Sequence, residues 1–263
     1  MDRTNQTGTS YESHLFPLPG ASTDVQFSLQ SSKSGQPDRT YEHILSAPVH
    51  YEPRYEYPLV IWLHSPGRDE HEILSAVPRL SMRNYVAVAP RAVKYRCRNG
   101  SISGSVSGRC SRIAPMYDWP TDGPLVEEAE ERIFRAIDRA RSECSVSSKR
   151  IFLVGLGSGG TFALKTGTKY PEYFAGAVSM LGAFPKEERP LRCWRQTRSF
   201  PIFLAVGLYS RTFTPADAAL QLRLFHTAGM SALIHQYETA DQPTAQMYRD
   251  VNHWIMDRVT GGH

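Results

Sequence analysis

The sequence predicts an α/β domain built on a mostly parallel central sheet with helices on both faces. Two observations carry this prediction. Nearly continuous apolar runs, such as Tyr57 to Ser65 (YPLVIWLHS) and Arg150 to Gly155 (RIFLVG), are typical of strands buried on both faces. Segments with helical spacing separate these runs, and strands that alternate with helices form parallel sheets through right-handed crossovers. A chain of 263 residues with 41% hydrophobic residues suits one large domain of this class.

The N-terminal strands are the exception to the parallel pattern. Residues 24–30 and 40–51 have the character of antiparallel edge strands around a turn rich in Ser, Gly and Pro. Pro78 should kink or divide the first helix. The other predicted elements follow in order: strand 57–65, helix 69–84, strand 85–92, loop 91–120, helix 124–144, strand 150–155, a helix directly after it, strand 174–181, strand 200–208, helix 215–228, strand 231–238 and helix 244–259.

The predicted domain organisation has a polar N-terminal tail over residues 1–24 and a single domain over residues 25–260. Within that domain, the loop over residues 91–120 is rich in Arg, Ser and Gly. Its basic residues between positions 91 and 112 are Arg91, Lys94, Arg96, Arg98, Arg109 and Arg112. Such residues form either a docking patch for phosphate or acidic partners or a solvated insertion. Composition favours the insertion, and the role of residues 91–112 stays open.

Charge and composition exclude several function classes. A net charge of +4 and a pI near 8.9 do not indicate a nucleic-acid partner. No segment approaches the ~18 apolar residues of a membrane span, and the N-terminus has no signal-peptide pattern, so a cytoplasmic protein is expected.

Four scattered cysteines without a CxxC pair predict reduced thiols and no metal site, although Cys97 and Cys110 share the loop and their pairing stays open. The turn GLGSGG lacks the ending of a P-loop and the spacing of GxGxxG, so no cofactor is expected.

Four local motifs occur in a recognisable order. They are PLVIWLHSPG after the third strand, VGLGSGGTFAL with YPEYFAGAVSM behind it, FLAVGLYSRTFTP, and RDVNHWIM in the last helix. On these motifs, over roughly residues 40 to 260, the chain resembles the α/β-hydrolase-fold serine esterases of the phospholipase/carboxylesterase type. The resemblance implies Ser, Asp and His in that chain order, with the serine on a nucleophile elbow as Gly-x-Ser-x-Gly. It also implies two backbone N–H groups that hold the oxyanion, one after the nucleophile and one after the third strand.

The elbow position of this sequence is occupied by glycine. Gly155, Gly159 and Gly160 match the family's glycines, which puts Gly157 at the nucleophile and Ser158 one place later. The register with Ser158 as nucleophile would put Leu156 where the close strand–helix crossing needs a small residue. Glycine also adopts the strained elbow backbone at little steric cost. We therefore interpret Ser158 as a hydroxyl at a helix N-terminus, with a fallback role as nucleophile.

The other two triad positions also differ from the family. Ser210 stands where the acid should follow the strand ending at Gly207, while Asp217 is already in the next helix. Counting back from RDVNHWIM puts Asp241 in the place of the histidine. His235 lies in a strand and His253 in a helix, and both are interpreted as structural or surface residues.

The loop His64-Ser65-Pro66-Gly67 resembles the oxyanion loop of the family. The second donating amide would belong to Pro66, and proline has no N–H. His64, Ser65, Pro66, Gly67 and Ser158 are therefore the predicted lining of a cleft at the carboxyl ends of the strands, where open α/β sheets bind ligands.

These differences predict a pseudo-hydrolase with a degenerate triad (Gly157, Ser210, Asp241) that binds a small molecule or a protein through the inherited cleft. Two alternatives stay open. One is an active carboxylic-ester or thioester hydrolase that uses Ser158, and the other is an interaction module that binds through the basic loop. The identity of the ligand and the oligomeric state are not predicted.

Overall fold

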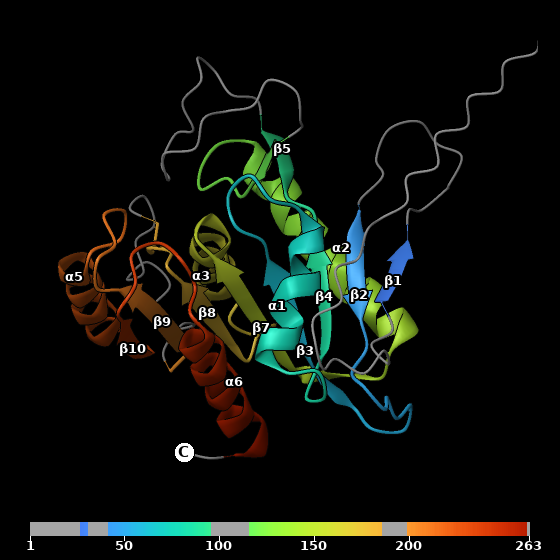
Figure 1. Ribbon diagram of the computed structural model, residues 1–263. Helices are drawn as coiled ribbons and strands as arrows, with labels where there is room; N and C mark the ends of the chain where they lie inside the picture. The colour runs from blue at the N-terminus through green and yellow to red at the C-terminus, as the bar shows by residue number, and fades with distance from the viewer. Residues whose placement is uncertain (1–26, 31–41, 96–115, 186–198, 262–263) are drawn as a thin grey trace, which may run out of the picture.

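The computed structural model describes residues 27–30, 42–95, 116–185 and 199–261, and an eight-stranded sheet forms its centre (Figure 1). The strand order is β1-β2-β4-β3-β7-β8-β9-β10. From β4 through β3 and β7 to β10 every neighbouring pair is parallel, whereas β1 pairs with β2 and β2 with β4 antiparallel. The predicted fold class, including the antiparallel strands at the N-terminus, is confirmed. The strands of this sheet are β1 (Phe27–Gln30), β2 (His43–Ser46), β3 (Tyr57–Leu63), β4 (Val86–Pro90), β7 (Val146–Leu156), β8 (Gly176–Met180), β9 (Pro201–Gly207) and β10 (Ser231–Tyr237).

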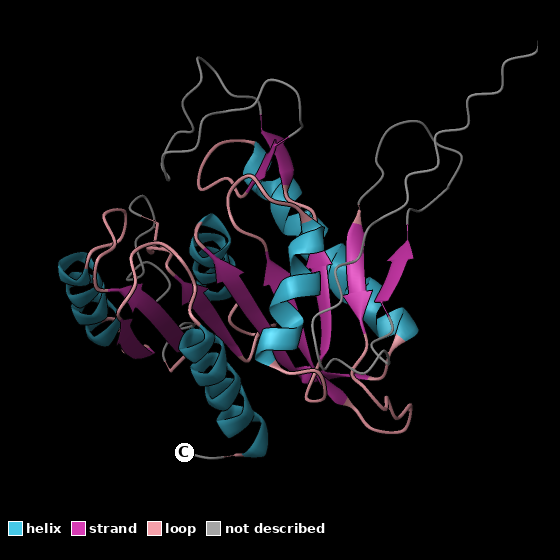
Figure 2. Cartoon of the chain, in the orientation of Figure 1, coloured by secondary structure: helices cyan, strands magenta, loops and turns pink. Residues whose placement is uncertain are grey.

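Helices cover both faces of the sheet (Figure 2). Helices α2, α3 and α5 pack on one face through residues such as Ile133, Phe162 and Phe225, and α1 and α6 pack on the other through Ile73 and Val251. Strands β3, β4 and β8 are buried along their whole length, as expected for strands between two helical layers. The helices are η1 (Glu70–Glu72), α1 (Ile73–Leu80), α2 (Leu125–Glu143), α3 (Ser158–Lys169), α5 (Pro215–Thr227) and α6 (Ala245–Thr260).

The first helical segment is shorter than predicted. A 3-10 turn, η1, precedes α1, and the helix ends two residues after Pro78. Ser81 then takes an extended backbone conformation. Pro78 lies inside α1 and does not divide it, and because proline crowds only the turn before it, Pro78 does not account for the end at Leu80.

The ends of the predicted loop are also different from expectation. Strand β5 (Val93–Tyr95) pairs antiparallel with β6 (Met116–Asp118). The sequence analysis missed this ladder because three residues on each side carry no usable periodicity. Arg96, Arg98, Arg109, Arg112, Cys97 and Cys110 lie outside the described residues, as does the N-terminal tail over 1–24.

Two smaller findings concern the same part of the sequence analysis. Cys144 is a free, half-buried thiol. Among the described residues, none of the helices is both long enough and apolar enough to cross a membrane.

Candidate functional site

The turn between β7 and α3 is built on glycines. Gly157 precedes α3 with φ +59° and ψ −120°, a backbone conformation that L side chains rarely adopt. A Cβ on Gly155 would lie 2.2 Å from the carbonyl carbon of Gly159, so the strand and the helix cross too closely for any side chain there. Gly155, Gly157 and Gly159 therefore occupy a tight strand–turn–helix in which position 157 is the strained turn residue.

Pro66 packs against this turn. A Cβ on Gly157 would lie 2.9 Å from Cδ and 3.4 Å from Cγ of Pro66. The first distance is shorter than real Cβ contacts, and a proline ring has little freedom to move aside. Position 157 thus lacks a side chain, and its neighbour fills the space into which a side chain would extend.

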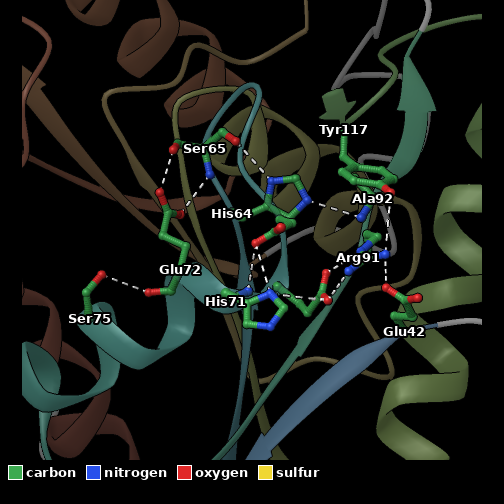
Figure 3. A network of polar contacts seen from close by, with 11 residues as sticks. Glu42, His64, Ser65, His71, Glu72, Ser75, Arg91, Ala92 and Tyr117 are labelled. Atoms are coloured by element: carbon green, nitrogen blue, oxygen red, sulfur yellow. Dashed lines mark hydrogen bonds and ion pairs between the residues drawn. The ribbon is translucent and has the colours of Figure 1, made fainter. Parts of the chain in front are cut away.

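The loop after β3 uses its backbone N–H groups internally (Figure 3). The N–H of Ser65 donates to Oε2 of Glu72 at 2.8 Å, and the Ser65 hydroxyl donates to Oε1 of Glu72 at 2.5 Å. The N–H of Gly67 donates to the Tyr117 carbonyl at 3.0 Å. Because Pro66 has no N–H, none of the three consecutive residues 65–67 directs an uncommitted backbone donor outward.

His64 is fully buried beneath this loop. Its Nε2 accepts the N–H of Ala92 at 3.1 Å, so the proton sits on Nδ1, which donates to the Ser65 carbonyl at 2.9 Å (Figure 3). Burial lowers the pKa of His64, although the Ser65 carbonyl and the negative charges of Glu72 and Asp118 act in the opposite direction. A neutral imidazole with both nitrogens engaged positions the loop and does not transfer protons.

A buried ion pair lies beside His64. The Arg91 guanidinium donates to both oxygens of Glu70, through Nε at 2.5 Å and through Nη2 at 2.5 Å, and it also pairs with Glu42 (Figure 3). Asp69, Glu70 and His71 bring potential metal ligands within 4.8 Å of one another. Because Arg91 occupies both Glu70 oxygens, this group is explained as an ion pair, and Arg91 is not part of a free basic patch.

The loops after β9 and β10 meet at the carboxyl edge of the sheet. The Ser210 hydroxyl donates to Oδ1 of Asp241 at 2.7 Å, and the Thr212 hydroxyl donates to the same oxygen at 3.0 Å. The backbone N–H of Leu208 donates to the carbonyl of Tyr237 at the end of β10, and that of Tyr209 donates to the carbonyl of Thr239 in the loop after β10. The two positions that the resemblance assigns to the acid and the histidine are therefore in direct hydrogen-bond contact.

Ser158 has a partner that sequence reasoning missed. Its hydroxyl donates to Oδ1 of Asp118 at 2.5 Å. Asp118 ends β6, and the backbone N–H of Trp119 donates to the same oxygen at 2.8 Å. Burial raises the pKa of Asp118, although both hydrogen bonds favour the charged form. No local signal marked this carboxylate, since only the β5–β6 ladder brings it to Ser158.

The remaining candidates lie in the elements expected for them. Asp217 belongs to α5, where it forms a capping box with Thr214. His235 lies in β10 with its ring against Phe203 and Nδ1 3.5 Å from Asp250. His253 is exposed on α6.

Comparisons with known proteins identify the family and the fold. The model of the dienelactone hydrolase family matches residues 49–251. Crystal structures of Arabidopsis thaliana SOBER1 superpose with a TM-score of 0.61 at 19% identity, over 77% of this chain and 99% of that one. The Bacillus cereus carboxylesterase gives 0.59 at 16% identity, over 83% and 94%, and a ferulic acid esterase gives 0.63 at 12%, over 90% and 97%. No curated protein matches the sequence.

Proposed function

The chain belongs to the dienelactone hydrolase family, and we propose that it is a member that no longer hydrolyses esters and instead binds a small molecule or a protein through the inherited cleft. Its fold is that of the esterase-type hydrolases with which it superposes. The loss of hydrolysis and the binding role are the proposal.

The observation that carries the proposal is the contact between Gly157 and Pro66. A serine at position 157 would need both a strained backbone and the space that the Pro66 ring occupies. The same proline removes the second oxyanion donor. Losing one such donor costs roughly 10²–10³ in rate, and losing a triad serine or histidine costs on the order of 10⁶.

The polar groups that replace the triad support a binding role. Ser210 and Asp241 form a hydrogen-bonded pair, but a carboxylate in the place of the imidazole has no second nitrogen with which to pass a proton between nucleophile and leaving group. Such a pair offers fixed acceptor oxygens to a ligand at the carboxyl edge, where open α/β sheets bind their ligands.

The test is steady-state hydrolysis of short-chain p-nitrophenyl esters by the purified protein. We expect turnover no faster than in protein-free buffer. Turnover that disappears in Ser158→Ala and persists in Ser75→Ala, an exposed serine on α1, would instead establish the competing function, an ester or thioester hydrolase that uses Ser158.

A thermal-shift titration of the Ser158→Ala variant with the same esters tests the binding role without acylation of Ser158. A saturable rise in Tm indicates a small-molecule site, because a ligand that binds only the folded state stabilises it. An unchanged Tm over the whole series excludes short acyl esters as ligands and leaves another class of small molecule or a protein partner.

A further inference from the structure

The contact between Ser158 and Asp118 joins a nucleophilic atom to a base. Ser158 is the first residue of α3 and is partly exposed. Its hydroxyl donates to the Asp118 carboxylate at 2.5 Å, within the reach that general-base catalysis requires. Neither Ser158 nor Asp118 stands at a position of the family's triad, because the elbow position is Gly157.

Asp118 is held in place from two sides. The Trp119 N–H anchors the oxygen that also accepts from Ser158, and the β5–β6 ladder fixes the backbone. Burial raises the pKa of the carboxyl group, which makes it a stronger base than an exposed aspartate. The nearby His64 is neutral and engaged with the backbone of Ser65 and Ala92, so it does not compete for the proton.

The start of α3 favours negative charge next to the Ser158 hydroxyl. Gly157 caps the helix without a side chain, and the next two helical residues, Gly159 and Gly160, are also glycines. The N–H groups of a first helical turn have no partner within the helix, and the helix dipole is positive at this end. The positive end of this dipole would favour an oxyanion that forms on a carbonyl attacked by Ser158.

We propose that Ser158 and Asp118 form an acyl-accepting pair, which takes the acyl group from an activated ester or thioester and retains it on Ser158. The inference rests on the proposed loss of hydrolytic turnover, because it assigns the first half of an esterase reaction to new residues and leaves the second half without a catalyst.

The Ser158 oxygen forms a bond to the acyl carbon, its proton passes to Asp118, and the bond from the acyl carbon to the leaving oxygen or sulfur breaks. The leaving group departs with the bonding electrons as a phenolate or thiolate. Only leaving groups that are stable as anions suit this site, because the anchored carboxyl group has no mobile ring to deliver a proton to them. The acyl-enzyme persists because the Ser158 ester then covers Asp118, the base that a hydrolytic water would need.

The experiment is rapid mixing of the full-length protein with p-nitrophenyl acetate, followed by intact-mass analysis and peptide mapping. We expect a burst of p-nitrophenolate equal to one acyl group per protein, no sustained release, and an acetyl group on Ser158. Ser158→Ala, a change at a partly exposed helix start, should abolish the adduct. Asp118→Asn should slow the burst by roughly 10² or more, the usual contribution of a general base.

Two variants serve as matched controls. Ser75→Ala and Asp138→Asn make the same chemical changes on exposed parts of α1 and α2 and should leave the burst unchanged. Absence of an adduct, or an adduct only on other residues, overturns the acyl-accepting pair and leaves the proposed binding function standing. Sustained release that depends on Ser158 overturns the proposed loss of hydrolysis instead.

Discussion

On the β3–β7 side of the carboxyl edge, the elbow turn has a glycine at position 157, and a proline ring lies against that turn. The Pro66 ring lies where a side chain on Gly157 would extend, and the N–H groups of Ser65 and Gly67 are bound internally. On the β9–β10 side the residues are also changed, but Ser210 and Asp241 keep a hydrogen bond between them, and Thr212 adds a second. One side is packed, and the other remains polar.

The two sides differ in how well each would tolerate a substitution that changes a side chain. A packed site resists a returning side chain because protein interiors tolerate little added volume. A polar pair can exchange donor and acceptor while the surrounding backbone stays in place. A serine at position 157 would therefore cost more folding stability than an exchange of polar residues at positions 210 and 241.

The largest expected effect is that of Gly157→Ser. The residue would adopt φ +59° with its Cβ 2.9 Å from Pro66. Backbone strain and overpacking each cost about 1–3 kcal/mol, so we expect a loss of about 2–6 kcal/mol in the free energy of unfolding. Urea unfolding measures this loss. The double variant Gly157→Ser/Pro66→Gly should recover the part that is due to the ring.

Gly123→Ser separates strain from contact. Gly123 also has a positive φ, +78°, but a Cβ there would meet nothing within 4 Å. This variant should lose only the strain, about 1 kcal/mol. Equal losses at positions 123 and 157 would contradict the packed description of the β3–β7 side.

The sequence predicted the strand order and the meeting of the β9 and β10 loops, but it did not predict the contacts of Pro66 and Asp118. The order of strands and helices is encoded in apolar periodicity, and the convergence of the loops after β9 and β10 follows from strands that end at a common edge. Asp118 could not be found, because it reaches Ser158 through a ladder of three residues per strand. The Pro66 contact was also missed, since the sequence predicts a missing N–H at proline but not which neighbour its ring touches.

On the β9–β10 side, the loss in the free energy of unfolding should be smaller than that caused by Gly157→Ser. Asp241→Ala removes the acceptor of the buried Ser210 hydroxyl and should cost about 1–3 kcal/mol. Ser210→Ala combined with Asp241→Ala should cost less than the sum of the two single changes, by about 1 kcal/mol, because the hydrogen bond between the two residues is then lost only once. Asp138→Ala on the exposed face of α2 is the control. Additive losses would show that the pair contributes nothing to the stability of this side.

His64 should make the free energy of unfolding depend on pH. Burial lowers its pKa from the ordinary 6.5, so below that pH the unfolded chain binds a proton that the folded protein does not. The free energy of unfolding should then fall as pH decreases from 6.5 toward the lowered pKa, by at most about 1.4 kcal/mol per pH unit, and change little above 6.5. Urea unfolding between pH 7 and pH 5 measures the slope. His64→Gln, whose amide oxygen can accept the Ala92 N–H, should flatten the slope, whereas His253→Gln on the exposed face of α6 should leave it unchanged. An unaltered slope in His64→Gln would assign the acid sensitivity to other groups. It would also contradict the interpretation that a neutral His64 holds the loop after β3 in place.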